Sequence, residues 1–343
     1  MERYLGPFIC ALVFAAVLTP LVRRLALALW IMDEPAERKV HERPVPLWGG
    51  LAIFLSFLFT AKIFASEFQA FGGIVVAGTL ITVIGLIDDV RPLSAKTKFL
   101  GQILASLVLI ALGTKIEFLT NPFGGMIYLG WWGIPLTVLW VVSITNMVNL
   151  IDGLDGLAAG VAAIASAALW VVAASKGQTT MALLSAVLAG GALGFLPYNF
   201  NPAKIFMGDT GSMFLGFMLA ALSVEGALKG AATIALTIPL LVLGVPFFDT
   251  LFAIWRRYRE GRPVYKADRG HLHHRLLDMG LSQKAAVLLV YAFSVALGIT
   301  AIIVSQLGEA GSFLAVVSLG VFMYLLSEVM TTAVPVGKEK NHG

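Results

Sequence analysis

Residues 157–175, LAAGVAAIASAALWVVAAS, carry no charged side chain. A helix rises 1.5 Å per residue, so about 20 apolar residues cross the hydrocarbon core of a bilayer. Apolar stretches of similar length recur along the chain. They predict about eleven transmembrane helices, near residues 4–29, 48–66, 71–87, 99–114, 131–149, 157–175, 178–196, 212–227, 230–255, 284–305 and 311–332.

The composition supports a membrane protein. Of the 343 residues, 58% are hydrophobic and only 13% are charged, whereas soluble domains carry roughly 25% charge. The net charge of +4 comes from basic residues in short loops, which indicates membrane orientation and argues against nucleic acid as a partner. Cys10 is the only cysteine, which excludes an intrachain disulfide. We expect an all-α polytopic membrane protein with one domain over residues 1–343.

The basic residues predict the orientation. An odd number of helices places the termini on opposite sides of the bilayer. The loops at 31–47, 88–98, 149–158, 197–211 and 256–283 and the C-terminal tail then share one side. That side holds 19 of the 24 lysines and arginines, with the other 5 opposite. This bias makes it cytoplasmic and the N-terminus external.

All nine aspartates and all five histidines also lie on the expected cytoplasmic side. Acidic residues contribute little to orientation, so their clustering needs another cause. The first cluster is Asp88-Asp89, at the end of an apolar stretch and before Lys96 and Lys98. Adjacent carboxylates repel each other, and a divalent cation or a lysine relieves the repulsion. A solvated helix end explains the pair about equally well.

Two further segments carry aspartates between glycines. Asn149, Asp152 and Asp155 are spaced three residues apart and would share one face of a helix. The alternative is a plain turn between two helices. Asp209, in FMGDTGS at residues 206–212, begins an expected helix, where it would bind a metal with its anion or would cap the helix.

The basic loops form a third group. Residues 269–275 read RGHLHHR, and three histidines so close together could bind zinc. The surrounding arginines favour a polyanion instead. Arg38, Lys39 and His41 in the first loop would contact a phosphate or would only orient the chain. Asp249 is an acidic residue within an apolar stretch, which favours a functional role, although pairing with a nearby arginine is a sufficient structural explanation.

Together these segments resemble the polyprenyl-phosphate N-acetylhexosamine-1-phosphate transferase family. The matching residues are Asp88-Asp89 with Lys96 and Lys98, Asn149-x-x-Asp152-Gly-x-Asp155-Gly, Phe206-Met-Gly-Asp209-Thr-Gly-Ser and His271-Leu-His273-His274. The order and spacing agree over nearly the whole chain. The His-x-His-His form is similar to the branch that uses UDP-N-acetylglucosamine (UDP-GlcNAc).

The resemblance implies a multi-pass enzyme of the bacterial inner membrane, with its active site on the cytoplasmic face. It would transfer GlcNAc-1-phosphate from UDP-GlcNAc to undecaprenyl phosphate and release UMP, as the first membrane step in the synthesis of a cell-envelope glycan such as lipopolysaccharide, teichoic acid or another. It implies Mg²⁺, with Mn²⁺ as an alternative, and leaves room for a homodimer. Phosphoryl transfer depends mostly on positioning and charge neutralisation.

The resemblance also assigns roles to residues. Asp209 would bind Mg²⁺ directly with help from Asp89 or Asp155, and Asp88 would position or deprotonate the lipid phosphate. The nucleotide, sugar and phosphates would be held by Asn149, Asp152, Asp155, Asn199, Phe206, Lys98, Arg269, His271, His273, His274, Arg38, Lys39 and His41.

Three alternatives remain open from the sequence. The donor would instead be UDP-MurNAc-pentapeptide or another UDP-N-acetylhexosamine. The reaction would proceed by direct attack or through an aspartyl-phosphate. A secondary transporter of an anionic solute is the distant alternative. Transporters place charges near the bilayer midplane and often show inverted repeats, whereas the aspartates here lie at the ends of expected helices on one face and the sequence shows no internal repeat.

Overall fold

The computed structural model describes residues 2–35, 43–64, 71–120, 126–228 and 279–307, together with positions 240, 241, 243, 244, 276, 277, 317 and 320. Its helices are α1 (Glu2–Ala28), α2 (Gly49–Phe64), α3 (Gly72–Val90), α4 (Ala95–Ala111), α5 (Gly133–Leu150), α6 (Leu157–Ser175), α7 (Thr179–Asn199), α8 (Gly208–Leu228) and α12 (Gln283–Val304). A short 3-10 helix, Gly130–Trp132, leads into α5. The helices expected near 230–255 and 311–332 lie, apart from isolated positions, outside the described residues.

Six of the described helices are long and apolar enough to cross a membrane, judged by length and composition. They are α1, α3, α5 with its preceding turn, α6, α7 and α12. Helix α2, with 16 residues, is apolar but shorter. The prediction of a mainly helical, multi-pass protein is therefore confirmed, and α6 has the bounds expected from its apolar run. The total of eleven helices and the orientation stay predictions.

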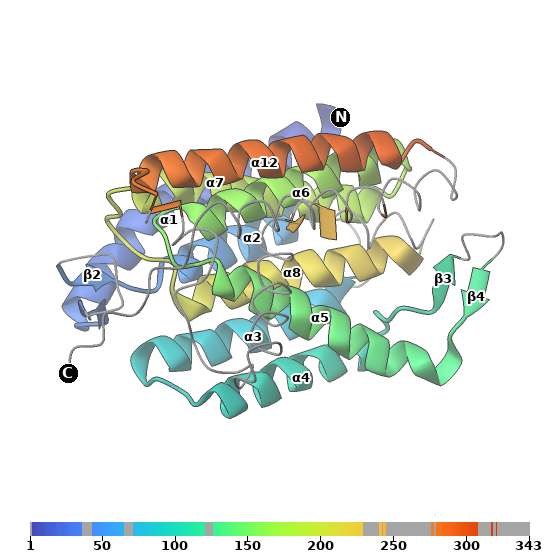
Figure 1. The fold of residues 1–343 in the computed structure, drawn as a ribbon. Coiled ribbons are helices and arrows are strands. Elements are labelled where there is room, and N and C mark those ends of the chain that lie inside the picture. Colours follow the sequence, from blue (N-terminus) through green and yellow to red (C-terminus); the bar gives the residue numbers. More distant parts are fainter. Residues whose placement is uncertain are drawn as a thin grey trace, which may run out of the picture.

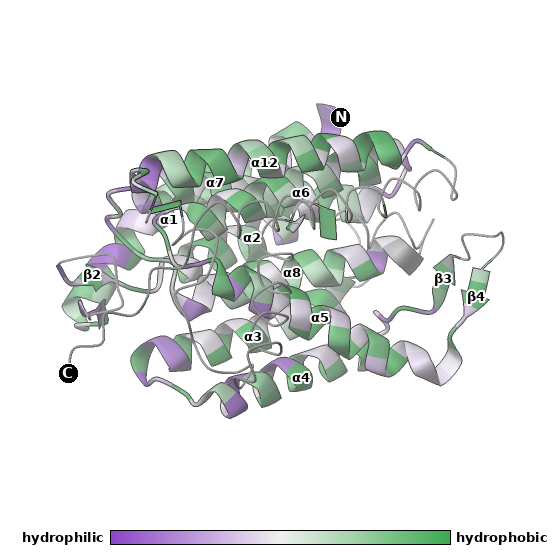
Figure 2. Ribbon diagram, viewed as in Figure 1, coloured by the Kyte–Doolittle hydropathy of each residue, from purple (hydrophilic) through white to green (hydrophobic). Residues whose placement is uncertain are grey.

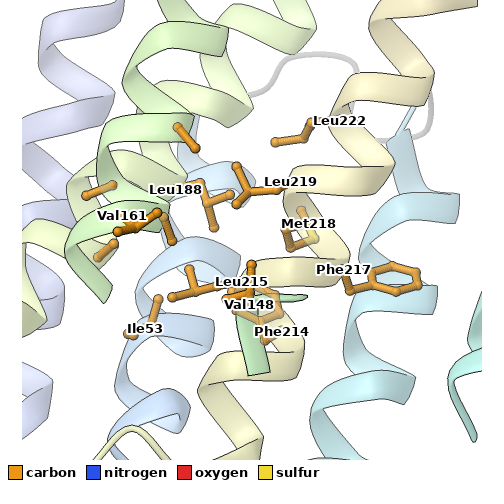
Figure 3. Packing of buried hydrophobic residues seen from close by; sticks show 14 of the residues in the cluster. Ile53, Val148, Val161, Leu188, Phe214, Leu215, Phe217, Met218, Leu219 and Leu222 are labelled. Atoms are coloured by element: carbon orange, nitrogen blue, oxygen red, sulfur yellow. The ribbon is translucent and has the colours of Figure 1, made fainter. Parts of the chain in front are cut away.

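Helix α8 lies at the centre of the bundle. It contacts α2, α3, α5, α6 and α7 and separates a layer containing α1, α6, α7 and α12 from a layer containing α3, α4 and α5 (Figure 1). Every residue from 210 to 226 is buried, as expected for a helix that is apolar all round. Phe214, Leu215 and Met218 meet side chains of α2, α5, α6 and α7 in this core (Figure 3).

The first turn of α8 is packed unusually closely by its neighbours. A Cβ atom on Gly85 of α3 would lie 2.5 Å from Cα of Thr210, which is closer than any real contact. Gly50 of α2 likewise faces the backbone of Gly211. Small residues let helix backbones approach each other in membranes, so these glycines bring two neighbouring helices directly against the start of α8.

Two short antiparallel hairpins depart from the all-α expectation. Strand β1 (Met32–Asp33) pairs with β2 (Val45–Pro46), and β3 (Phe118–Thr120) pairs with β4 (Met126–Tyr128). They lie at opposite ends of the bundle (Figure 1). Hydrophilic residues gather at the β1–β2 end, where α3 ends and α4 and α8 begin (Figure 2).

Candidate active site

A cavity of about 550 Å³ opens at the hydrophilic end of the bundle. Its walls come from β1, the ends of α3 and α7, the turn between α5 and α6, and the start of α8. The lining residues are Met32, Asp33, Leu47, Asp88, Asp89, Val90, Pro92, Asn149, Asp152, Gly153, Leu154, Asp155, Asn199, Phe206, Gly208 and Asp209. Six of them are aspartates, although they come from distant parts of the chain.

Asp89 caps α8 from another helix. Its Oδ1 accepts a hydrogen bond from the backbone N–H of Asp209 at 2.8 Å, and its Oδ2 accepts from the N–H of Thr210 at 3.2 Å and from Thr210 Oγ1 at 2.5 Å. A carboxylate is favourable here because the first N–H groups of a helix have no partner within the helix. Gly208 makes this contact possible, since its φ is +70° and a Cβ atom would overlap the Asp89 carboxylate.

Lys98 links the other two carboxylates. Its Nζ lies 2.7 Å from Asp88 Oδ2 and 2.5 Å from Asp209 Oδ2. Ser94 Oγ caps α4 by accepting from the N–H of Thr97, so Lys98 lies in the first turn of that helix and reaches toward α3 and α8. The other oxygen of Asp88 accepts from the N–H of Leu93 at 2.7 Å. One ammonium group therefore partly neutralises two carboxylates.

Asn149, in the last turn of α5, completes the surroundings of Asp209. Its Nδ2 donates to Asp209 Oδ1 at 3.0 Å and to Ser212 Oγ at 2.9 Å. Both oxygens of Asp209 thus have a donor, one from α4 and one from α5. The carboxylate is held between two helices, as a preorganised binding group requires.

The segment after α5 does not continue as a helix. Helix α5 ends at Leu150 and residues 151–156 form turns, so Asp152 and Asp155 do not share a helical face with Asn149. Asp155 Oδ2 accepts from Asn201 Nδ2 at 2.9 Å and from the N–H of Ala203 at 3.0 Å. These bonds hold the segment that leads into α8.

Asn199 holds the same segment from the end of α7. Its Oδ1 accepts from the N–H of Gly156 and its Nδ2 donates to the carbonyl oxygen of Ile205, both at 3.1 Å. Phe206, the next residue but one before Gly208, also lines the cavity. Asn199 and Asp155, both predicted to bind the substrate, therefore also hold the cavity wall in place through hydrogen bonds.

Asp152 lies in the turn between α5 and α6 and lines the cavity together with the other aspartates. Burial raises its pKa well above the ordinary value, and the nearby charges of Asp209, Asp89, Asp155 and Asp33 raise it further. The folded protein therefore favours the protonated form of this carboxyl.

The structure brings most of the predicted site together. Eight predicted residues line the cavity and Lys98 joins them through its ion pairs. Asp33 also lines it but was not predicted as a site residue, although it belongs to the group of aspartates on the expected cytoplasmic side. Arg38, Lys39, His41, Asp249, Arg269, His271, His273 and His274 lie outside the described residues.

The residues present fit a divalent cation. Carboxylate oxygens of Asp88, Asp89 and Asp209 lie within 4.8 Å of one another, and such oxygens are the ligands that Mg²⁺ prefers. Lys98 already provides one positive charge beside two of them. The cluster differs in one member from the expected group of Asp209, Asp89 and Asp155, because it contains Asp88, which shares Lys98 with Asp209. Asp155 lies outside the cluster and accepts from Asn201 and Ala203.

Fold and site together define a multi-pass membrane protein with an acidic pocket at one end of its helical bundle. The family model for glycosyl transferase family 4 matches residues 71–227, which contain most of this pocket. The chain belongs to glycosyl transferase family 4, and the predicted resemblance is confirmed.

Relatives of known name agree with this assignment. The chain is 42% identical over 333 residues to a probable undecaprenyl-phosphate N-acetylglucosaminyl 1-phosphate transferase of Bacillus subtilis, over 96% of this chain and 92% of that protein. It is 40% identical to a decaprenyl-phosphate N-acetylglucosaminephosphotransferase of Mycolicibacterium smegmatis, over 79% and 74% of the two chains. An undecaprenyl-phosphate alpha-N-acetylglucosaminyl 1-phosphate transferase of Yersinia pestis is 26% identical, over 84% and 79%.

Proposed function

We propose that this protein transfers GlcNAc-1-phosphate from UDP-GlcNAc to undecaprenyl phosphate and releases UMP. The observation that carries the proposal is the grouping of Asp88, Asp89 and Asp209 around Lys98 in a cavity at one end of an apolar bundle. A dianionic donor and an anionic lipid must meet at the membrane surface, and this cavity offers Lys98 and a group of carboxylates that would hold a charge-compensating cation there. The relative from Bacillus subtilis, which aligns over nearly the whole chain, supports the same reaction.

In the proposed reaction, an oxygen of the lipid phosphate attacks the phosphorus bonded to the sugar. The bond from that phosphorus to the bridging oxygen breaks, and UMP leaves with the bonding electrons. Both oxygens of Asp88, Asp89 and Asp209 already accept hydrogen bonds or an ion pair. We favour direct attack over an aspartyl-phosphate, because direct attack uses no carboxylate as the nucleophile and leaves all three to hold the cation and its neighbours in place.

The residues take the following parts. Asp209 would hold Mg²⁺ together with Asp88 or Asp89, and the bound ion would neutralise charge on the pyrophosphate. Lys98, which lies beside Asp88 and Asp209, would contact a phosphate oxygen. Asn149 keeps Asp209 in place, and Asp88, next to the apolar surface of α3, would orient the lipid phosphate.

The rest of the cavity suits the nucleoside and sugar. Phe206 lines the cavity together with Asp152 and Asp155, a combination that fits a uracil ring and hydroxyl groups, and Asn199 holds the wall beside them. Most basic residues of the chain lie in loops on the aspartate side, which supports a cytoplasmic active site in the inner membrane of a bacterium. The basic loop at 256–283 would add charge toward the pyrophosphate.

Donor competition with the purified protein tests the proposal. Undecaprenyl phosphate and labelled UDP-GlcNAc should give labelled lipid pyrophosphate and UMP, and unlabelled UDP-MurNAc-pentapeptide should not compete. EDTA should abolish the transfer, and Mg²⁺ or Mn²⁺ should restore it. Labelled product in excess chelator would contradict the metal assignment. Competition by UDP-MurNAc-pentapeptide at equal concentration would contradict UDP-GlcNAc as the specific donor and would favour the pentapeptide compound instead.

A further inference from the structure

One helical turn from Lys98 and Asn149, a pair of amide side chains joins the neighbouring helices α4 and α5. Gln102 of α4 and Asn146 of α5 bond reciprocally: Asn146 Nδ2 donates to Gln102 Oε1 at 2.6 Å, and Gln102 Nε2 donates to Asn146 Oδ1 at 3.3 Å. Gln102 is 2% exposed. Gln102 Nε2 also approaches the sulfur of Met213 in α8 at 3.6 Å. The pair therefore joins two helices and contacts a third.

The amide pair repeats the arrangement of the site one turn deeper. Gln102 follows Lys98 by four residues, and Asn146 precedes Asn149 by three, so each amide lies on the same face of its helix as the site residue above it. Met213 likewise follows Asp209 by four residues in α8. The upper layer is Lys98, Asp209 and Asn149, and the lower layer contains one residue from each of the same three helices.

Stability alone is a weak reason for two amides at this depth. Interhelical hydrogen bonds in membranes contribute little net stability, and two apolar side chains of similar size would fill the space without the cost of burying amides. A reciprocal amide pair does fix the relative height and rotation of two helices, as a buried asparagine does in coiled coils. The helices it fixes are those whose side chains hold the two oxygens of Asp209.

We propose that Gln102 and Asn146 are positioning residues for the transfer reaction, which set the separation of Lys98 and Asn149 on either side of Asp209. This inference rests on the proposed function for its kinetic part. Without the pair, α4 and α5 would slide or rotate by a fraction of an ångström. Asp209 would then meet its donors, and any bound metal, in a less favourable geometry. Misplacement on this scale costs catalysis even far from the reacting atoms.

The test uses the full-length protein with both amides replaced, Gln102→Leu with Asn146→Leu. Removing both partners leaves no unpaired amide, so the melting temperature should stay near that of the wild type. Mn²⁺ binding, measured by electron paramagnetic resonance without substrates, should weaken about tenfold, and kcat should fall about tenfold. The exchanged pair, Gln102→Asn with Asn146→Gln, should recover most of both losses.

Ser106→Ala is the matched control. Ser106 lies one turn further along the same face of α4, and within the described part of the chain its hydroxyl bonds only to the carbonyl oxygen of Gln102, so its removal should change neither Mn²⁺ affinity nor kcat. If the double variant does not fold, Gln102→Met decides, because Asn146 keeps its bond to the carbonyl oxygen of Val142. Gln102→Met should lose Mn²⁺ affinity and kcat as well, but by smaller factors than the double variant.

A folded Gln102→Met or double variant with wild-type Mn²⁺ affinity and kcat would overturn the positioning role and leave the pair a packing feature. A wild-type protein that binds Mn²⁺ without transferring GlcNAc-1-phosphate would overturn the proposed function instead. The Mn²⁺ measurement would still decide the present inference.

Discussion

The two ends of α8 carry buried polar groups of very different kinds. At its first turn, the carboxylates of Asp88, Asp89 and Asp209 converge around Lys98 beside a cavity. Toward its C-terminal end, Glu225 accepts from Thr114 Oγ1 at 3.2 Å and Ser223 accepts from Trp140 Nε1 at 3.0 Å. The first arrangement brings several like charges together, whereas in the second each polar side chain is paired by a separate hydrogen bond.

This difference in charge grouping distinguishes a functional site from polar contacts that only hold helices together. Like charges gathered in one cavity oppose folding unless a cation or a proton relieves them, so a fold retains them where binding needs them. The bonds at the far end tie α8 to α5 and to the loop after α4, and each contributes modestly to packing. A burial pattern alone would not distinguish the two ends, because α8 is buried along its whole described length between 210 and 226.

Lysine substitutions should give the largest contrast between the ends. Lys98→Met removes the positive charge shared by Asp88 and Asp209 and should lower kcat about a hundredfold or more, as loss of an electrostatic contact at a reacting centre does. Lys115→Met removes a lysine at the other end, whose ion pair with Glu117 is 3.4 Å long and partly exposed. It should change kcat less than about twofold. Equal losses of kcat in Lys98→Met and Lys115→Met would contradict the distinction between a functional and a structural end of α8.

Asp89→Ala should have the next largest effect, on stability. The two N–H groups at the start of α8 and the Thr210 hydroxyl lose their acceptor, which should cost about 2 kcal/mol of unfolding free energy. Thr114→Val, which removes a single bond at the other end, should cost less than half as much. Reversible unfolding in mixed detergent measures both. An Asp89→Ala protein as stable as the wild type would contradict the capping role.

Asp152→Asn should have the smallest effect, which should be seen in how the melting temperature depends on pH. The folded pKa of Asp152 is raised, so the folded chain keeps this proton at pH values where the unfolded chain has lost it. This group's contribution to stability therefore falls as the pH rises between the unfolded and the folded pKa. Asparagine removes that dependence and should raise the melting temperature at pH 8 relative to the wild type, while transfer activity falls. Parallel melting curves from pH 5 to 8 for both proteins would contradict the account.

The sequence predicted the helices better than their ends. The uncharged run 157–175 coincides with α6, because hydropathy alone marks where lipid replaces water. Helix α3 instead continues to Val90 and α8 begins at Gly208. Hydropathy could not show this, because the carboxylates at these ends remain within helical structure through bonds to other elements.

The site residues were recognisable, but their partners were not. Aspartates between glycines mark a candidate site in the sequence, yet the contact of Lys98 with Asp209 spans 111 positions. No local pattern encodes such a pairing. The same limit hid the bonds of Asp155 to Asn201 and Ala203, the reciprocal pair of Gln102 with Asn146, and the β1–β2 hairpin that carries Asp33.

The most direct measurement compares one carboxylate at each end of the same helix. Asp209→Asn keeps the shape of the side chain but removes the charge that faces Lys98 and the proposed metal, and the transfer rate should fall about a hundredfold or more. Glu225→Gln makes the same chemical change at the other end and should leave the rate within about threefold. Both proteins should melt near the wild-type temperature, since each amide keeps the shape of the side chain and one acceptor oxygen, and at position 209 the loss of one of three neighbouring like charges offsets the weaker contact with Lys98. A folded Asp209→Asn protein with near-normal turnover would contradict the central claim.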